Sequence, residues 1–510
     1  MGNGPGGLKD YIDLWRSEPI SQGGFVWEFN NHGILKKDDN GTEYFAYGGD
    51  FGETPNDGDF IMDGLTLSDH TPMPSMLEYA KTIQPVEVNL TTDGTQLLVT
   101  NHYDFVDLSG LDPQWHVVQD GKSTKPKKLD LPRIPAGESR KVDLPLDKGS
   151  LSHEAWIIVE FKLKENKPWA EKGHVVAWDQ VHLSGPAVGA QQRRAVNSAA
   201  RRAADLQVSR PKPTRLEIQS GATTFGFDLL QGNVTWTVNG AEIFQRGPEL
   251  YLYRSQTQND EASQGDGTVW DQAYVGMVHT QVRDVSWEET DSGVTVHYKN
   301  WVAPKVWEWG VEADLIYTIP ADDDEEAPRL RLRTTGKFVG DNTPTVLPRI
   351  GLMAVLPREF DSVAWFGRGP GESYPDSKQA CRMGEYEATV DDLFTYYDYP
   401  QENGNREDLR WVRVGNPDAG IALDARRSDD GDGEQDAPVS FSFTARRYMP
   451  HDLDAAKHPH DLKPLDMTVL HLDYANNGLG SATVGPTAFE PYKCYAEPFD
   501  FTFDFGVVAS

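Results

Sequence analysis

The stretch AYGGDFGETPNDGDFIMDGL, residues 46–65, is crowded with Gly, Asp, Asn and Pro. Side-chain oxygens of Asp and Asn, together with backbone carbonyls, are the ligands that hard cations bind. The stretch is also longer than an ordinary connector between two elements. Composition alone favours a solvated surface loop, and a cation site is the alternative that these residue types leave open.

Glu28 is a second candidate, because it lies in the run QGGFVWEF, which predicts a buried strand over residues 25–29. Cleavage of a glycosidic bond with retention of configuration needs two carboxyl groups about 5 to 5.5 Å apart. The end of one strand supplies only one of them. Glu28 alone therefore does not predict a catalytic pair.

Three histidines, His451, His458 and His460, lie close together in MPHDLDAAKHPHDLKP. A His-x-His pair could mark a transition-metal site. The segment lacks a further Cys or carboxylate at ligand spacing and is rich in loop residues. We therefore expect these histidines on the surface.

The elements around these candidates begin with a Gly- and Pro-rich loop and a helix over residues 8–16, whose one face carries Leu8, Tyr11, Ile12 and Trp15. A helix followed by a strand is the repeating unit of a (β/α)8 barrel, which needs roughly 250 residues. Here the pattern turns to all β after about residue 80. Residues 1–84 are predicted to be an incomplete barrel, the least stable part of the isolated chain, with unburied aromatic side chains such as Trp15, Phe25 and Trp27.

The rest of the chain predicts a mainly β fold. Short alternating runs over residues 85–186 are typical of a β-sandwich. Residues 187–213 are rich in Ala and Arg and end in two prolines, which indicates a linker. Residues 214–510 predict one large antiparallel β-sandwich. The acidic runs 321–328 and 428–438 are expected to be solvated loop tips within it.

Composition narrows the classes of function. A net charge of −31 argues against a nucleic-acid partner, which needs a basic surface. No apolar run of 18 residues predicts a membrane span, and no secretory leader is evident, so we expect a cytoplasmic protein. Cys381 and Cys494 lie far apart and are expected to be two unpaired thiols.

Several longer stretches resemble the large bacterial-type β-galactosidases of glycoside hydrolase family 2. They occur in the same order over nearly the whole chain, and several are long enough to be specific. These stretches are QGGFVWEFNNHGI, AYGGDFGETPNDGDFIMDGL with SDHTPMPSMLEYAK, NHYDFVDLSGLDPQW, LPRIGL, FGRGPGESYPDSKQA, YPQENGNRED and HLDYANNGLGSATVGP.

The resemblance implies a retaining β-galactosidase that hydrolyses terminal β-D-galactose from lactose-type substrates. The chain is similar to its C-terminal half: a barrel remnant, an immunoglobulin-like domain and the small-chain domain. Met1 to Gly4 resemble the end of a Glu-Tyr-x-His-Ala-Met-Gly-Asn stretch whose glutamate is the nucleophile. Neither catalytic glutamate is then expected in this chain, and the isolated chain is expected to be inactive.

The resemblance also assigns binding roles. Trp27 is similar to a tryptophan that forms an apolar wall beside galactose. The carbonyl of Phe60 and the side chain of Asp63 match sodium ligands, and Asp63 also matches a sugar contact. Asn56 matches a residue near a second magnesium position. Val484 falls where some relatives place a tryptophan or cysteine at the second sugar site, so stacking on glucose is in doubt here.

The implied partners are a β-galactoside, magnesium, sodium and the missing N-terminal half, supplied in cis or as a large subunit, in a homo-oligomer when complete. Many relatives have Asn where Asp63 stands, and Asp would still bind a hard cation with more negative charge. The alternative is a non-catalytic carbohydrate-binding or scaffold remnant that folds alone.

Overall fold

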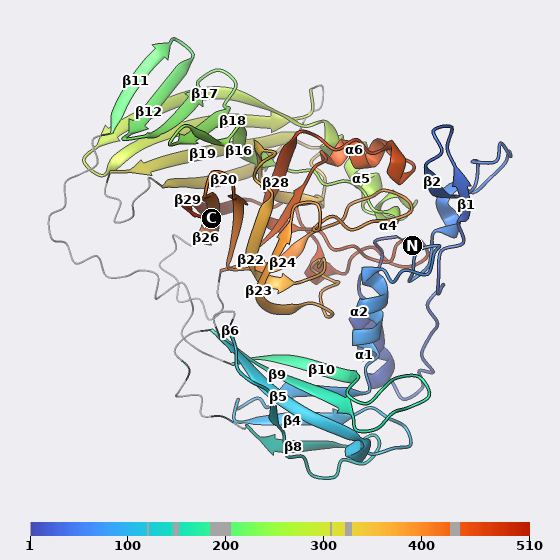
Figure 1. Cartoon of the computed structure of the whole chain (residues 1–510). Helices are drawn as coiled ribbons and strands as arrows, with labels where there is room; N and C mark the ends of the chain where they lie inside the picture. Colours follow the sequence, from blue (N-terminus) through green and yellow to red (C-terminus); the bar gives the residue numbers. More distant parts are fainter. Residues whose placement is uncertain are drawn as a thin grey trace.

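The computed structural model describes residues 2–119, 122–144, 146, 151, 154–183, 206–305, 309–321, 329–428 and 439–510. Three parts follow one another: two helices with loops, a small β-sandwich, and a large assembly of sheets (Figure 1). The mainly β fold is confirmed. Within these ranges no helix combines the length and apolar character that crossing a membrane requires.

The first part contains the predicted helix as α1 (Leu8–Ser17) and a second helix, α2 (Pro74–Thr82), which begins with proline at its first turn. Between them lie a hairpin of β1 (Ile34–Lys37) and β2 (Glu43–Ala46) and the short 3-10 helix η1 (Gly58–Ile61). The long loop 46–65 runs from β2 through η1. It lies beside the large assembly of sheets (Figure 1).

The strand predicted over residues 25–29 is wrong for this structure. Backbone bonds run from residues 28 and 29 to residues 63–66 on one side only, and the single bridge there joins Asn30 to Thr66. A strand needs a continuous ladder, and no described strand lies on the other side. Phe25 and Trp27 are exposed, as expected for an incomplete barrel, whereas Trp15 is half-buried.

The small sandwich packs a three-stranded sheet on a five-stranded one (Figure 1). Alternating burial along β4 matches the predicted alternation of apolar and polar residues. The first sheet has the order β3 (Val86–Leu90), β4 (Gln96–Asn101) and β8 (Ser139–Asp143). The second has the order β10 (Val175–Leu183), β9 (Ala155–Leu163), β5 (Leu111–Gln119) and β6 (Lys122–Ser123), with β7 (Lys127–Lys128) also paired to β5; η2 (Leu108–Gly110) precedes β5.

The large assembly holds three sheets that share one apolar core. The first is β11 (Gln207–Lys212), β12 (Arg215–Ser220), β13 (Thr223–Asp228), β14 (Val234–Val238) and β15 (Ala241–Phe244). The second, in spatial order, is β16 (Arg246–Tyr251), β21 (Arg349–Pro357), β28 (Met467–Asn476), β27 (Phe441–Arg446) and β24 (Arg406–Leu409).

The third sheet has nine strands in the order β17 (His279–Thr290), β18 (Gly293–Ala303), β19 (Gly310–Pro320), β20 (Leu330–Val339), β29 (Phe499–Ala509), β26 (Ile421–Ser428), β25 (Trp411–Asn416), β22 (Ser362–Gly369) and β23 (Arg382–Thr389). Short helices lie in the connections: α4 (Gln258–Glu261), α5 (Gly267–Gln272), η4 (Val275–Met277), α6 (Pro450–Ala455), η5 (Pro459–Asp461) and η6 (Glu490–Tyr492).

The predicted linker is wrong over its last residues. Gln207–Lys212 form β11, and Val208 packs on the core. Pro211 is tolerated because β11 is an edge strand, where a missing N–H costs little. Residues 187–205 of the linker, and nearly all of both acidic runs, lie outside the described residues. Both cysteines are free, as expected, and buried.

Charged pairs join the small sandwich to the large assembly. Arg410 donates to both carboxylate oxygens of Glu154 at 2.9 and 2.6 Å, and both side chains are buried. Gln180 on β10 exchanges two hydrogen bonds with the backbone of Met383 on β23, at 2.8 and 2.7 Å. These contacts fix the small sandwich against the edge strand β23 and against Arg410, which lies between β24 and β25.

We expect Arg410→Met to lower the free energy of unfolding by about 3 kcal/mol, because it leaves the buried carboxylate of Glu154 without its partner. Arg140→Met removes an exposed pair with Glu138 in the same sandwich and serves as the control, with a change below about 0.5 kcal/mol. Urea unfolding of the purified variants measures both. Equal effects would contradict the assigned importance of the buried pair.

Limited chymotrypsin digestion should cut first at Phe25 or Trp27 among residues 2–119. These side chains are exposed, and their segment has hydrogen-bonded neighbours on one side only. Leu97 and Trp115, which chymotrypsin could also cleave after, lie in the core of the small sandwich and should be protected. Early cleavage within β3 or β4, with residues 18–30 intact, would disprove this order of stability.

Candidate functional site

Asp63 is the candidate residue with an unused binding atom. It is buried, and its Oδ1 has no hydrogen-bond partner among the described residues. Its backbone carbonyl accepts from Glu28 at 2.8 Å, which places it beside the segment that carries Trp27. An orphaned carboxylate oxygen can accept a donor from a ligand or coordinate a cation.

The loop before Asp63 is held mainly by its own bonds. Asn56 accepts from Gly58 N at 3.1 Å and donates to Glu53 O at 3.0 Å, while Gly48 N donates to Gly58 O at 2.9 Å. Backbone N–H groups, first that of Gly49, lower the pKa of Glu53. Asn56 is exposed, and both the nitrogen and the oxygen of its side-chain amide are already hydrogen-bonded within the loop. No group of three or more His, Cys, Asp or Glu side chains gathers as a metal site in the described ranges.

Trp27 and Phe60 supply exposed aromatic surface at this site. Trp27 is 74% and Phe60 51% exposed, and Phe60 lies in η1, three residues before Asp63. Glu28, next to Trp27, lies 3.4 Å from Nε2 of His32. The structure therefore brings Trp27, Phe60 and Asp63 onto adjoining segments.

The first residues of the chain are buried between this loop and the large assembly. Gly2 N donates to Met62 O at 3.2 Å. Asn3 donates from its backbone to Gln401 Oε1 and from its side chain to Glu402 O, both at 2.9 Å. A Cβ on Gly2 would lie 2.1 Å from Nε2 of Gln401, so only glycine fits there. Residues 2 and 3 therefore link the candidate loop to the 398–405 segment.

Asp398 holds the segments around this loop through hydrogen bonds to its side chain. Its Oδ2 accepts from Asn31 Nδ2 at 2.9 Å and from Ser68 N and Oγ at 3.1 and 2.9 Å. Asn31 in turn accepts from Gly64 N at 2.9 Å through its own side chain. One buried carboxylate thus ties together the segments on either side of Asp63.

Two acidic residues, Asp59 within η1 and Glu261 at the end of α4, are linked to this part of the chain. Asp59 accepts a hydrogen bond from Gln258 of α4, and Tyr399 donates to Glu261 at 3.4 Å. Burial, followed by the charge of Asp59, raises the pKa of Glu261 to about 7. The charge of Lys457, which donates to the hydroxyl of Tyr399 at 3.0 Å, opposes this rise.

His458 is buried, so the predicted surface position is wrong for it. Its Nε2 lies 3.0 Å from Asp50 Oδ1, and its ring packs on Tyr47 and stacks on His460. Burial follows from these partners in the loop after β2, which sequence spacing does not reveal. His451 is more than half exposed, as predicted.

Val484 is 88% exposed on a loop that is fixed at its base. Asp376 accepts from Leu479 N and Gly480 N, each at 2.8 Å. Ser481 lies 3.0 Å from the hydroxyl of Tyr11 in α1, so this loop contacts the helix of the first part.

Sequence reasoning missed the residues that hold the site together: Asn3, Asp376, Asp398 and Gln401. Their partners lie about 100 to 400 positions away in the chain, and periodicity carries no such information. The sequence did offer one signal for Gln401, the long polar run YPQENGNRED within a β domain. In the structure, Gln401 and Glu402 of this run are buried.

Three families match successive parts of the chain. "Glycosyl hydrolases family 2, TIM barrel domain" matches residues 1–88, and "Beta-galactosidase, domain 4" matches residues 97–184. "Beta galactosidase small chain" matches residues 219–505, more than half of the chain.

Similar whole proteins bear the same name. The β-galactosidase of Kluyveromyces lactis is 32% identical over 99% of this chain and 46% of its own length. The β-galactosidase of Arthrobacter sp. (strain B7) is 31% identical over 98% of this chain and 48% of its own length. That of Vibrio cholerae is 30% identical over 98% of this chain and 46% of its own length. The chain spans about half the length of these relatives. It belongs to the β-galactosidases of glycoside hydrolase family 2 and corresponds to the end of their TIM barrel, their domain 4 and their small-chain domain.

Proposed function

We propose that this chain forms part of an enzyme that hydrolyses terminal β-D-galactose residues. The observation that carries the proposal is the exposed indole of Trp27 on a segment whose next residue, Glu28, bonds to the backbone of Asp63, a buried residue whose Oδ1 has no partner among the described residues. A flat apolar ring and an oriented acceptor suit a sugar, which presents C–H groups on one face and hydroxyls at its edge. The family to which the chain belongs supports the reaction class.

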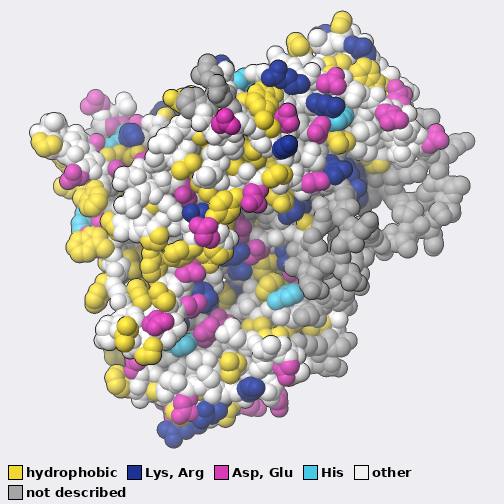
Figure 2. Space-filling view, turned by 180° about the vertical axis from the view of Figure 1, so that it is seen from behind, with side chains coloured by type: hydrophobic (Ala, Val, Ile, Leu, Met, Phe, Trp, Pro, Cys, Tyr) yellow, Lys and Arg dark blue, Asp and Glu magenta, His cyan; other side chains and the backbone are white. Residues whose placement is uncertain are grey.

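The complete barrel is proposed to come from further polypeptide, in cis or as a separate subunit. The first part exposes many apolar side chains, and Figure 2 shows such side chains along its left edge, the side of β1 and β2. Exposed apolar surface of this kind marks an interaction site. The residues are Leu14, Ile20, Phe25, Trp27, Phe29, Ile34, Leu35, Phe51 and Phe60.

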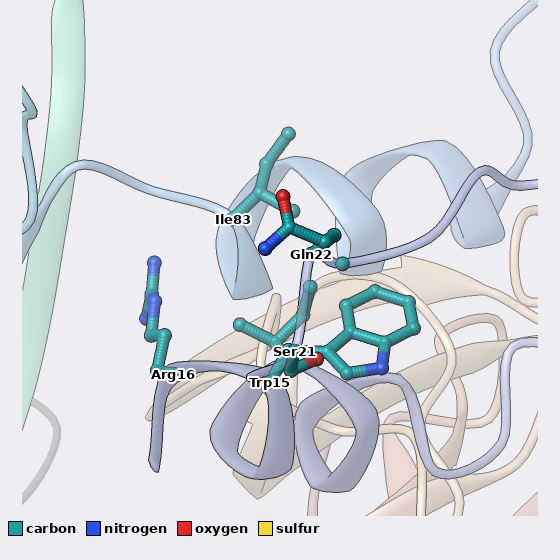
Figure 3. Close-up of a pocket in the computed structure, with 7 residues that line it drawn as sticks. Trp15, Arg16, Ser21, Gln22 and Ile83 are labelled. Carbon is teal, nitrogen blue, oxygen red and sulfur yellow. The ribbon is translucent and has the colours of Figure 1, made fainter. Parts of the chain in front are cut away.

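A groove of about 270 Å³ between α1 and the end of α2 supports the same proposal (Figure 3). Trp15, Ile12 and Ile83 give it apolar walls, and Gln22 and Arg16 lie at its rim. It suits apolar side chains of the remaining barrel better than a sugar, which needs more polar partners.

Both catalytic glutamates are proposed to lie on that further polypeptide. Asn3 and Gly2 would follow closely after the nucleophile strand, and their contacts with Gln401 and Met62 would hold the end of that strand in place. The role of this chain is then to orient the sugar and to position the neighbouring strand.

Sodium is proposed to bind through Asp63 and the carbonyl of Phe60. The orphaned, buried Oδ1 of Asp63 fits a hard cation. Such an ion would supply a positive charge that orients a sugar hydroxyl. Asn56 has both amide groups engaged within its loop, so the support for magnesium there is the family resemblance alone.

The isolated chain should not hydrolyse a chromogenic β-galactoside. Without the nucleophile and the acid, binding groups cannot form or break the glycosyl bond. Activity should appear when the N-terminal part of a family relative is added or fused. Turnover by the isolated chain that survives purification and is lost in Glu28→Gln would refute the proposal. No activity in any complemented form would favour a non-catalytic scaffold.

In the complemented enzyme, Asp63→Ala should lower kcat/KM roughly ten- to a hundred-fold, the value of a lost charged hydrogen bond of about 1.5 to 3 kcal/mol. The response of the rate to sodium should flatten as well. Trp27→Ala is the matched control, because it removes apolar surface and should lower kcat/KM while preserving the sodium response. If Asp63→Ala left both kcat/KM and the sodium response unchanged, the loop would be a solvated connector without a binding role.

A further inference from the structure

The sheet β16-β21-β28-β27-β24 has two different faces, and both are buried. Its apolar face joins the large core through residues such as Ile350, Leu352, Leu470 and Leu472. The alternate positions on the same strands are polar, as on a sheet that faces water. They include Arg349 on β21, Thr444 and Arg446 on β27, and His471 and Asp473 on β28, all at most 1% exposed.

Charged groups from other segments cover this polar face. Glu402 accepts from Arg446 at 2.9 and 3.0 Å, which is a normal ion pair. Arg349 is different: its Nη2 lies 3.6 Å from Glu402 and 3.7 Å from Asp473. Both separations are longer than a hydrogen bond. The guanidinium therefore lies within ion-pair distance of two carboxylates but donates a hydrogen bond to neither.

The polar atoms left without partners belong to both chemical types. Donors come from the guanidinium groups, and acceptors come from the carboxylate. The atoms without a partner in the described residues are Nε, Nη1 and Nη2 of Arg349, Nε and Nη1 of Arg446, both carboxylate oxygens of Asp473, both ring nitrogens of His471, Oγ1 of Thr444, and Nδ2 and Oδ1 of Asn476. Buried ionised groups are stable only when such atoms are satisfied.

Because unpartnered donors and unpartnered acceptors occur together here, the group that binds them must both accept and donate hydrogen bonds. An anion only accepts hydrogen bonds, so it would serve Arg349 and repel Asp473. A cation would do the reverse. Water donates and accepts, so it can bridge the two groups at once.

Gly351 accommodates the carboxylate of Asp473 on the neighbouring strand. Gly351 lies opposite Asp473 in the ladder, and the register shifts between Ile350 and Gly351. A Cβ on Gly351 would lie 2.4 Å from Oδ1 of Asp473. The absence of a side chain at Gly351 therefore makes room for the carboxylate of Asp473 itself.

We propose that the space between Arg349, His471 and Asp473 is a closed hydration site, in which ordered water bridges the guanidinium to the carboxylate. Burial raises the pKa of Asp473 to about 7, against the opposing charge of Arg349. Water serves both protonation states, because it can donate to the carboxylate or accept from the carboxylic acid. A direct ion pair would suit only one of them.

A crystal structure of the chain at high resolution tests the proposal without any substitution. We expect density for water at about 2.7 to 3.2 Å from both an Arg349 nitrogen and an Asp473 oxygen. A direct contact between Arg349 and Asp473 with no such density would overturn it. Crystals soaked in bromide provide a second test, and an anomalous peak beside Arg349 would show an anion site instead.

The double substitution Arg349→Met with Asp473→Leu removes the bridge while keeping the side-chain volumes similar. Oxygen-17 relaxation dispersion of the solution should then report fewer long-lived internal waters than in the parent chain. Lys9→Met, which removes an exposed pair with Asp13, is the control and should leave that number unchanged. A double variant that folds and retains all of these waters would overturn the proposal. If it does not fold, the parent crystal structure decides.

Discussion

The candidate site depends on one buried carboxylate, that of Glu402. It is fully buried and bonded twice to Arg446, and a carboxylate in that position must keep its partner, since an unpaired buried charge is costly. The ion pair therefore fixes the backbone of the 398–405 segment. The carbonyl of Glu402 and the side chain of Gln401 then bind Asn3. Through this contact, an ion pair inside one domain sets the position of residues from another.

The same principle recurs at Asp398 and Asp376. Each places a buried carboxylate where it accepts backbone N–H groups from a loop: Ser68 for Asp398, and Leu479 and Gly480 for Asp376. Burial raises the pKa of Asp376, while these N–H groups oppose the rise. These two carboxylates therefore hold loops that carry or adjoin exposed side chains. Trp27, Phe60 and Val484 are exposed on the segments that these groups hold.

What the sequence could predict was local or came from resemblance. The spacing of Leu8, Tyr11, Ile12 and Trp15 predicted the first helix, and alternation such as that in β4 predicted the β domains. The motif stretches identified the family and the loop with Phe60 and Asp63, whose ligand roles remain predictions. These features depend on neighbours within a few residues or on long specific runs.

The errors share a cause in distant contacts. The run 25–29 has strand composition, but the described chain gives it a hydrogen-bonding neighbour on one side only. His458 is buried by Asp50 and Tyr47, about 400 positions away, and Gln207–Lys212 pair with β12 despite a proline. No local pattern encodes such partners.

The same distances bear on how the chain folds during synthesis. Asn3 contacts residues about 400 positions later in the chain, and Tyr11 meets Ser481 470 positions later. A ribosome adds about 5 to 20 residues per second, so these first residues wait tens of seconds for their partners. The small sandwich, built from contacts within one short stretch of chain, can form in that interval. Residues 2–11 therefore reach their final position only after their distant partners are made, and until then their apolar side chains are open to chaperones and to aggregation.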